Sequence, residues 1–518
     1  MRTPVPVIDI FAGPGGLGEG FSAFKSEDGK PVFEIKLSIE KDKSAHQTLE
    51  LRAFYRQFLN GVAPAEYYQY LRGENNIDRS TLFNKYPKES KAAQKEAWMA
   101  TLGETDRALV KRRIDDALNG ALNWVLIGGP PCQAYSLIGR ARMRNVNPWK
   151  YARDRRHKLY KEYLQILADH HPPVFVMENV KGLLSSQRTK TKKENTFALI
   201  LTDLRNPSNA VYGDNSSLSY KLFSISHKSP ENPEDIKPED FVVHSEEYGI
   251  PQARHRIIIL GIRSDIYASN PRLLKKSEKQ VPIEAVIGDL PKLRSGLSKE
   301  KDTPEEWRKA IKEIENVDWM KSITFEMRTS IQSALKRVGA SLERGDSFVP
   351  FIVGPNEYDY WYVDNKLGGV CNHETRSHIR ADLHRYFFAS VFSRKYNKPP
   401  KLSDFPSELL PKHKNVQKES DGTIFNDRFR VQISGRPSTT VVSHISKDGH
   451  YYIHYDPSQC RSLTVREAAR LQTFPDNYFF EGNRTQQYHQ VGNAVPPLLA
   501  HKIAEIVYKV LQTQDKNA

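Results

Sequence analysis

The amino-acid sequence predicts an α/β protein, with a doubly wound, Rossmann-like domain and a smaller domain of irregular structure. Two observations predict the first domain: an apolar strand runs into the glycine-rich turn Ala12–Phe21, and a second strand ends on an acid, Glu40. A third is the apolar run Trp124–Ile127, which is followed by a loop of two glycines and two prolines. Ligands bind where strands end in open α/β sheets, so these turns mark the expected site.

The composition limits the class of protein. With 518 residues, 38% of them hydrophobic, the chain is long enough for two or three domains. No apolar run approaches the ~18 residues of a membrane helix, and the N-terminus lacks the cleavage pattern of a signal peptide. Three scattered cysteines match neither a disulfide framework nor a zinc spacing, which indicates a reducing compartment. We therefore expect a cytoplasmic protein without a membrane partner.

The chain is also strongly basic. Its 77 lysines and arginines exceed its 62 acidic residues by 15. A net charge of +15 favours a polyanionic partner, of which nucleic acid is the commonest.

The first predicted strand, Pro4–Phe11, opens onto a turn with a nucleotide-binding pattern. Three of its glycines match the dinucleotide fingerprint, in which glycine lets the backbone approach a ligand: Gly13, Gly15 and Gly18. The alternating strand Phe33–Glu40 ends 22 residues after the last of these glycines, where a carboxylate commonly binds the two ribose hydroxyls. Together these features predict an adenosine-containing cofactor.

A cysteine follows the third strand. Residues 51–120 have helical spacing without a pattern that indicates chemistry. After Trp124–Ile127, the sequence Gly-Gly-Pro-Pro forces a tight, rigid loop that carries Cys132. Structural cysteines are usually buried among apolar residues, whereas this one follows the end of a strand. Cys132 is therefore a candidate functional residue.

Polar side chains also follow the later strands. Strand Pro172–Met177 ends at Glu178, beside the other loops of the same edge of the sheet. The strands Phe241–His244 and Arg256–Ile262 are predicted to pair. Between them, alternation puts three polar side chains on one face of an extended segment, and grouped arginines commonly bind anions: Gln252, Arg254 and Arg256.

From about Ser264 onward, charged helices and aromatic, basic loops replace the glycine-rich turns. Trp307–Met327 is predicted to be a helix, and Thr464–Gln472 is a helix with a capping pattern at its start. His373 and His378 have no companion cysteines at a metal-binding spacing, so no metal site is predicted. A turn and a closing helix end the chain.

Several motifs, in this order, resemble those of the C5-cytosine-specific DNA methyltransferase family of the prokaryotic, restriction-modification type. The resemblance covers the chain except for roughly residues 45–120 and 265–430. The motifs are Asp9-Ile-Phe-Ala-Gly-Pro-Gly-Gly, Gly129-Pro-Pro-Cys-Gln-Ala-Tyr-Ser, Glu178-Asn-Val, Gln252-Ala-Arg-His-Arg, Arg436-Pro-Ser-Thr, Arg470-Leu-Gln-Thr-Phe-Pro and Gly492-Asn-Ala-Val-Pro-Pro.

This resemblance implies a division into domains. Residues 1–265, with an insertion at about 45–120, would form a Rossmann-like, S-adenosylmethionine-dependent methyltransferase domain that residues 486–518 complete. Residues 266–485 would form a smaller, irregular target-recognition domain.

The resemblance also implies methyl transfer from S-adenosylmethionine to C5 of cytosine within a specific short DNA sequence. Cytosine C5 is a poor nucleophile, so Cys132 would add to C6 as a thiolate and push electron density onto C5. Glu178 would stabilise protonation at N3, Arg254 would contact the carbonyl of the base, and Arg256 would support the same loop. The base would have to be flipped out of the duplex.

The cofactor-binding residues carry over in the same way. By resemblance they are Phe11, Gly13, Gly15, Glu40, Pro131 and Asn493. Two departures concern the adenine. Lys41 stands where the family often has a large apolar residue, and the acid that usually follows the third strand is displaced, with Glu104 and Asp106 as candidates.

The implied partners are double-stranded DNA with a flipped cytosine and, genetically, a restriction endonuclease. A monomer that acts on one strand at a time would suffice. Three alternatives remain open on the sequence alone. A tRNA-methylating branch of the family has a similar core but largely lacks room for a DNA-reading domain. A nicotinamide oxidoreductase would explain only the glycine-rich turn. A non-catalytic DNA-binding protein would not need Cys132, Glu178 and Arg254 together.

Overall fold

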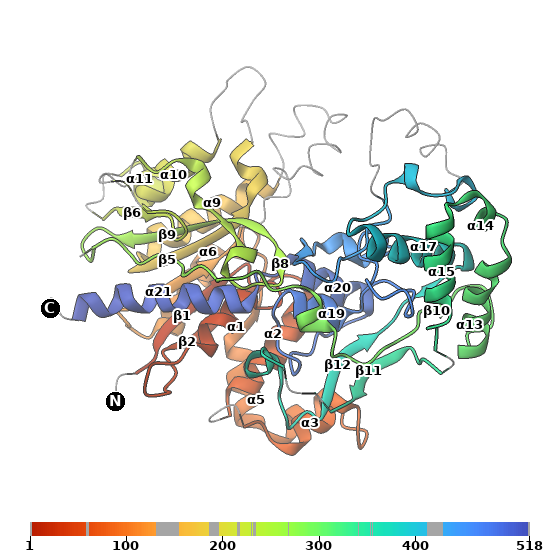
Figure 1. The fold of residues 1–518 in the computed structure, drawn as a ribbon. Coiled ribbons are helices and arrows are strands. Elements are labelled where there is room, and N and C mark those ends of the chain that lie inside the picture. Colours follow the sequence, from red (N-terminus) through yellow and green to blue (C-terminus); the bar gives the residue numbers. More distant parts are fainter. Residues whose placement is uncertain are drawn as a thin grey trace. The chain divides into compact units, whose positions relative to one another are not determined.

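The structure is a computed structural model that describes residues 3–58, 62–130, 155–185, 196–214, 218–228, 230, 235–267, 269–339, 341–352, 354, 356–411 and 428–515. The chain divides into two compact units, each described by itself below (Figure 1). Unit 1 comprises Met1–Gly61, Tyr86–Lys279 and Ala494–Ala518, and unit 2 comprises Val62–Lys85 and Gln280–Asn493.

These bounds differ in three places from the predicted division. The first boundary lies at Lys279 instead of residue 265, and the return to unit 1 begins at Ala494 instead of residue 486. Of the predicted insertion within the first domain, 45–120, the middle part belongs to unit 2 and the ends belong to unit 1. The roles assigned to the two domains stay predictions.

Unit 1 is built on an eight-stranded sheet of order β3-β2-β1-β4-β5-β9-β6, with β7 paired to β9 (Figure 1). The strands β1 to β5 are parallel, and β9 is antiparallel to β5, β6 and β7. The predicted α/β fold is confirmed. The strands of this sheet are β1 (Val5–Ile10), β2 (Phe33–Glu40), β3 (Ala97–Met99), β4 (Val125–Gly128), β5 (Val174–Val180), β6 (Tyr220–Phe223), β7 (Val242–His244) and β9 (His255–Arg263).

Helices cover both faces of this sheet. Ile8 and Ile10 of β1 point into a core shared with α6, α9 and α10, whereas Asp9 between them lies against Gly18 of α1. The alternation follows from the two-residue period of a strand. Within the described residues, the helices of unit 1 are α1 (Gly16–Ala23), α2 (Lys43–Arg56), α5 (Pro87–Glu96), α6 (Arg107–Leu118), α9 (Arg155–His170), α10 (Thr196–Arg205), α11 (Pro207–Tyr212) and α21 (Pro497–Asp515).

The final helix, α21, packs against α1 so closely that glycine is required at the contact. A Cβ atom on Gly16 would lie 2.1 Å from the carbonyl oxygen of Val495. A Cβ on Gly20 would lie 2.3 Å from the carbonyl oxygen of Pro497 and 2.4 Å from Cβ of Ala500. The C-terminal residues are therefore an integral part of the fold of unit 1.

Unit 2 combines helices with short strand pairs. Strands β11 and β12 form an antiparallel pair, and α13, α15 and α17 surround a core that includes Trp307 and Tyr386. Its main elements are α3 (Ala65–Arg72), α4 (Arg79–Lys85), α12 (Glu284–Ile287), β10 (Gly296–Leu297), α13 (Pro304–Lys312), α14 (Trp319–Ser322), α15 (Phe325–Leu335), β11 (Gly345–Pro350), α16 (Asp359–Tyr362), β12 (Gly369–Glu374), β13 (Ser377–His378), α17 (Arg380–Tyr396), α19 (Val465–Leu471) and α20 (Arg484–Asn493).

Two helix predictions for unit 2 have opposite outcomes. The capping pattern is confirmed, since Thr464 and Glu467 form a reciprocal capping box at the start of α19. The single helix over Trp307–Met327 is wrong. The chain forms α13, a 3-10 turn and α14 before α15 begins, because Val317 and Ile323 adopt extended backbone conformations.

Buried charges on and beside α19 organise the interior of unit 2. Arg461 donates from Nη1 and Nη2 to the two carboxylate oxygens of Glu467, each at 2.7 Å. Burial alone would raise the pKa of Glu467, but Arg461 holds it well below its usual range. Arg470 pairs with Asp289 and Asp476, also at 2.7 Å. Charges buried in this way are tolerated only when they are paired, so these contacts fix the position of α19.

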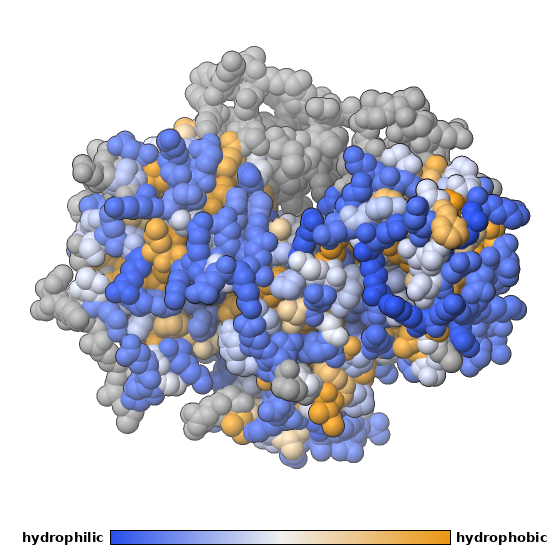
Figure 2. Space-filling model, in the orientation of Figure 1, coloured by the Kyte–Doolittle hydropathy of each residue, from blue (hydrophilic) through white to orange (hydrophobic). Residues whose placement is uncertain are grey.

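The surface agrees with the polar composition of the chain. On the face shown in Figure 2, hydrophilic side chains predominate and hydrophobic residues occur in small groups. Among the described residues, no helix has the length and apolar character needed to cross a membrane.

The contact between α1 and α21 predicts that Gly20→Ala destabilises unit 1 by roughly 1–3 kcal/mol, because the new methyl group overlaps backbone atoms that cannot move independently. The higher helix propensity of alanine acts in the opposite direction. The free energy of unfolding from urea titration tests this. Gly354→Ala is the matched control, since its Cβ would enter open space. Equal stability of the two variants would contradict the packing argument.

Candidate active site

The carboxyl ends of four parallel strands, β1, β2, β4 and β5, lie on one edge of the sheet of unit 1. Strand order reverses at β1, because β2 and β3 lie on one side of it and β4 and β5 on the other. A ligand-binding crevice is expected at such a switch point. The predicted site residues of unit 1 that the structure describes are at the carboxyl ends of these strands, on the segments that follow them, or on the neighbouring β9 segment.

The glycine-rich turn after β1 is held by Glu40 at the end of β2. Phe11, Gly13 and Gly15 all have positive φ angles, of 56°, 58° and 92°. Glycine adopts such angles freely, whereas Phe11 is strained there, a condition that is common at functional sites. The Glu40 carboxylate accepts hydrogen bonds from the N–H groups of Gly13 (2.9 Å), Lys41 and Asp42 (2.8 Å each).

These residues fit an adenosine-containing ligand. A Cβ built on Gly13 would have no atom within 4 Å, so the turn leaves room for a ligand to approach its backbone. The Glu40 side chain is half-buried, and its two oxygens have more acceptor positions than the three amides use. The ring of Phe11 is half-buried at the rim of the core. The acceptor oxygens of Glu40 suit a ribose hydroxyl pair, and the half-buried ring of Phe11 suits an adenine ring.

The end of β4 is tied to β5. The Nδ2 group of Asn179 donates to the carbonyl oxygen of Pro130 at 3.3 Å, and Oδ1 of the same side chain accepts from the N–H of Val180 at 2.9 Å. A Cβ on Gly129 would lie 2.7 Å from Oε2 of Glu178, so glycine lets this carboxylate approach the loop. Sequence reasoning did not select Asn179, although it is part of the Glu-Asn-Val motif. The predicted residues Pro131 and Cys132 lie outside the described residues.

Glu178 and Arg256 are brought together by the pairing of β5 with β9. The antiparallel register places Arg256 opposite Val180, and Nε of Arg256 lies 3.0 Å from Oε1 of Glu178. Burial lowers the pKa of the Arg256 guanidinium, and the adjacent carboxylate opposes that shift. The two side chains are only 13% and 14% exposed, so the pair is shielded from solvent. Two of the four predicted catalytic residues are therefore in direct contact.

Arg254 is fully buried, and its backbone is clamped from an adjacent turn. Its carbonyl oxygen accepts hydrogen bonds from the N–H (3.2 Å) and hydroxyl (2.7 Å) of Ser245, itself completely buried. The predicted uniform extension of this segment is wrong. The N–H of Arg254 donates to the carbonyl oxygen of Gln252, which makes a tight turn between β8 (Gln252–Ala253) and β9. Ser245 carries no sequence pattern that could have revealed this clamp.

Two further residues that the resemblance suggested for the cofactor lie at the ends of helices. Asn493 is the last residue of α20, in unit 2, and its side chain is exposed. Val495, whose carbonyl meets Gly16, follows it by two residues and belongs to unit 1. Asp106 caps α6, since its carboxylate accepts from the N–H of Leu109 at 3.0 Å. A short third strand, β3, precedes this cap, in a region where the sequence indicated only helices.

Asp9 lies beneath the glycine-rich turn and is completely buried. Neither of its carboxylate oxygens has a hydrogen-bond partner of good geometry among the described residues. Burial raises the pKa of Asp9 to about 8, although the nearby backbone of Gly18 and the charge of Arg56 oppose this. The carboxyl group is therefore protonated at neutral pH, which avoids an unpaired charge in the interior.

Comparison with known proteins gives a consistent result. The sequence profile of the C-5 cytosine-specific DNA methylase family matches residues 110–208 and 237–509. Type II methyltransferase M.Bpa9945I of Bacillus paralicheniformis is 32% identical over 98% of this chain and 99% of its own length. DNA (cytosine-5-)-methyltransferase M.ApeKI of Aeropyrum pernix is 28% identical over 76% of this chain and 83% of its own.

A solved structure has a related fold. A protein described as a DNA modification methyltransferase encoded within a prophage of E. coli superposes with a TM-score of 0.50 and 18% identity. The alignment covers 98% of this chain and 99% of that one. At this identity the likeness concerns the fold alone.

The buried carboxyl beneath the turn predicts how stability depends on pH. In the unfolded chain the Asp9 carboxyl ionises with the ordinary aspartate pKa of 3.8, whereas in the folded protein it keeps its proton up to about pH 8. Stability is therefore lost as pH rises between these values, by about 1.4 kcal/mol per pH unit at most. We expect Asp9→Asn to gain stability relative to the unchanged protein from pH 5 to pH 8, as measured by urea unfolding.

The matched control for this measurement is Asp28→Asn. Ion pairing and hydrogen bonding with Lys30 and Ser26 lower the pKa of the exposed Asp28 to about 2, so its titration is complete below pH 5. A stability difference that stays constant from pH 5 to pH 8 for Asp9→Asn would contradict the prediction.

Proposed function

Because the chain belongs to the C-5 cytosine-specific DNA methylase family, and is by that membership a DNA (cytosine-5-)-methyltransferase, we propose that it methylates C5 of cytosine within one short DNA sequence. The methyl donor would be S-adenosylmethionine. The observation that carries this proposal is the shielded Glu178–Arg256 pair, which lies against Gly129, three residues before Cys132. The nicotinamide oxidoreductase alternative has no support from family membership.

The chemistry needs a nucleophile that activates the base. The Cys132 thiolate would form a bond to C6, and the electron pair of the C5–C6 double bond would move toward C5. After C5 gains its methyl group, loss of the C5 proton restores the double bond and breaks the bond to sulfur. The target atoms are inaccessible in stacked duplex, so the cytosine would be flipped out. The hydrogen bond from Asn179 to Pro130 would help to position the cysteine loop.

The polar residues of β5 and β9 would bind the flipped base. Oε1 of Glu178 is oriented by Arg256, while Oε2 faces the Gly129 turn. That arrangement suits a carboxyl group that meets N3 and the exocyclic amine of cytosine. The Ser245 clamp would fix Arg254, whose guanidinium would contact the carbonyl of the base. Rigid support of this kind is what a positioned catalytic group requires.

The cofactor would bind at the glycine-rich turn. Glu40 would accept hydrogen bonds from the ribose hydroxyls, Phe11 would pack on the adenine, and the backbone at Gly13 and Gly15 would meet the methionine end. Bound there, S-adenosylmethionine supplies an electrophilic methyl group. Pro131 and Asn493 complete the proposed set.

Unit 2 would read the DNA sequence. Base readout depends on a few side chains presented to the groove, and the positive net charge of the chain favours contact with phosphates. The relatives M.Bpa9945I and M.DdeI of Desulfomicrobium norvegicum are both type II methyltransferases, and the latter is 25% identical over 96% of this chain and 87% of its own length. By that likeness we propose a restriction endonuclease as genetic partner and a cytoplasmic, monomeric enzyme.

The direct test is methylation-sensitive sequencing of DNA from a methylation-free bacterial host that expresses the chain. We expect C5 methylation at one short recurrent sequence, and none when the host expresses Cys132→Ala, because C6 addition is lost. A soluble protein that binds S-adenosylmethionine but leaves DNA unmethylated would contradict a DNA substrate and direct attention to RNA. A blank without cofactor binding would favour a non-catalytic DNA-binding protein.

A second test isolates the role of Glu178. Glu178→Gln keeps the size of the side chain but removes its capacity to donate a proton to N3, so we expect methyl transfer in a single turnover to slow by about 10²–10⁴-fold. Affinity for S-adenosylmethionine should be unchanged, since Glu178 is not in the proposed cofactor set. Glu27→Gln, at an exposed position of unit 1, is the control. A rate close to that of the control would refute the proposed role.

A further inference from the structure

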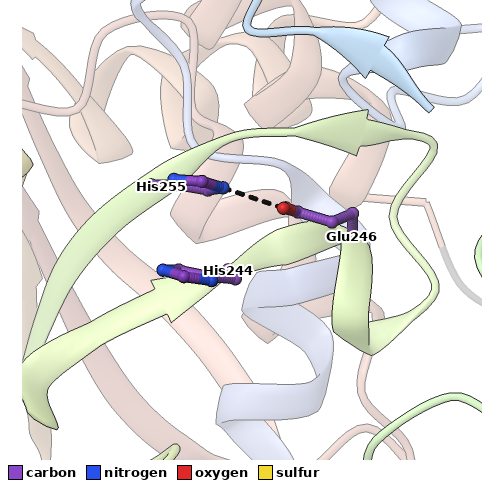
Figure 3. Close-up of side chains that lie close together, drawn as sticks. All are labelled: His244, Glu246 and His255. Carbon is purple, nitrogen blue, oxygen red and sulfur yellow. Dashed lines mark hydrogen bonds and ion pairs between the residues drawn. The ribbon is translucent and has the colours of Figure 1, made fainter.

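Two histidines face each other across a strand pair in unit 1. His244 ends β7 and His255 begins β9, and the antiparallel register places them directly opposite. Their rings stack with centroids 4.0 Å apart and planes 16° from parallel (Figure 3). Side chains directly opposite in an antiparallel pair have Cβ atoms ~5 Å apart, a spacing at which two imidazoles can reach one ion.

A carboxylate completes the group. Glu246 follows His244 by two residues, and its Oε1 lies 2.8 Å from Nε2 of His255 (Figure 3). Its other oxygen, Oε2, is buried and has no hydrogen-bond partner among the described residues. One ligand atom from each residue can be chosen so that all three lie within 4.8 Å of one another. The unsatisfied oxygen is an independent indication that a ligand belongs here, because buried acceptors are rarely left without a partner.

The neighbours of the cluster favour a neutral His244. Burial lowers the pKa of His244, and His255 lowers it further, while Glu246 and Glu247 oppose this shift. The charge of Lys181 also lowers it. Glu247 is itself engaged, with Oε1 3.4 Å from Nδ1 of His244 and Oε2 2.6 Å from Nζ of Lys276. A neutral imidazole is the form that binds a metal ion.

We propose that His244, Glu246 and His255 form a binding site for one divalent transition-metal ion such as Zn²⁺. Two imidazoles and one carboxylate are a ligand set that Zn²⁺ accepts at ~2.0–2.2 Å, with water in a fourth position. The ligand atoms, which now lie within 4.8 Å of one another, would have to move closer together to reach that distance from one ion. Side-chain exposures of 40% for His244 and 35% for His255 allow both this movement and the entry of an ion.

The proposed ion would join β7, the Ser245–Tyr248 turn and β9 at one point. That turn also carries the Ser245 clamp on the Arg254 carbonyl, so the metal would brace the arginine segment without touching it. It would replace the hydrogen bond between His255 and Glu246. Sequence analysis predicted no metal site, because these ligands form no spaced motif and meet only through the strand register. The inference does not rest on the proposed methyltransferase activity.

The test measures metal binding to the full chain carrying Cys132→Ala, which removes a thiol that could bind Zn²⁺ itself. Zn²⁺ affinity is obtained by competition with a chromogenic chelator, and Co²⁺ serves as a second probe through its visible absorption. We expect one ion per chain, and affinity at least about tenfold weaker in His244→Gln, His255→Gln and Glu246→Gln. Thermal stability should rise with Zn²⁺ in the background protein and not in these variants.

The matched control is His489→Gln, an exposed histidine of unit 2, which should bind Zn²⁺ as the background protein does. Circular dichroism confirms that each variant is folded. Absence of stoichiometric binding in the background protein would overturn the proposal. So would an affinity for Zn²⁺ that is undiminished in folded His244→Gln or His255→Gln.

Discussion

The antiparallel pairing of β5 with β9 is the constraint on which the candidate site depends. It sets Arg256 beside Glu178, and the absence of a side chain on Gly129 lets the same carboxylate approach the loop after β4. A shift of one residue in this register would turn Arg256 to the opposite face of the sheet and leave Glu178 without its cation. The apolar run of β9, buried between β5 and its other neighbours, is what secures the register.

Shielded charges have two kinds of role in this protein. In unit 1 some lie where strands end, at Glu40 and at the Glu178–Arg256 pair, while Glu19 and Arg52 form a buried pair inside the fold and Asp9 avoids ionisation instead of pairing. In unit 2 the pairs Arg461–Glu467 and Arg470–Asp476 lie inside the fold and position α19. The charges at strand ends stay available to a ligand, whereas the buried pairs serve the internal architecture.

The sequence predicted the sheet of unit 1 well, because strands buried on both faces appear as nearly continuous apolar runs. The predicted strand Phe33–Glu40 coincides with β2, and the acid at the end of β5 was selected on position alone. Contacts that depend on register or on a distant backbone atom could not be predicted. Ser245 reaches Arg254 only through a turn, and the predicted long helix over Trp307–Met327 is interrupted at Val317 and Ile323, whose backbones are extended.

The chain crosses between the units four times, at residues 61/62, 85/86, 279/280 and 493/494. The short excursion that forms α3 and α4 is anchored within unit 2, where Tyr68 donates to Asp364 (2.9 Å) and Tyr70 and Arg79 donate to Glu481 (2.7 Å each). Unit 2 is thus encoded in two separate stretches of the gene. Recombination that exchanged only the long stretch between relatives would separate these partners, so a unit 2 inherited intact requires both stretches to travel together.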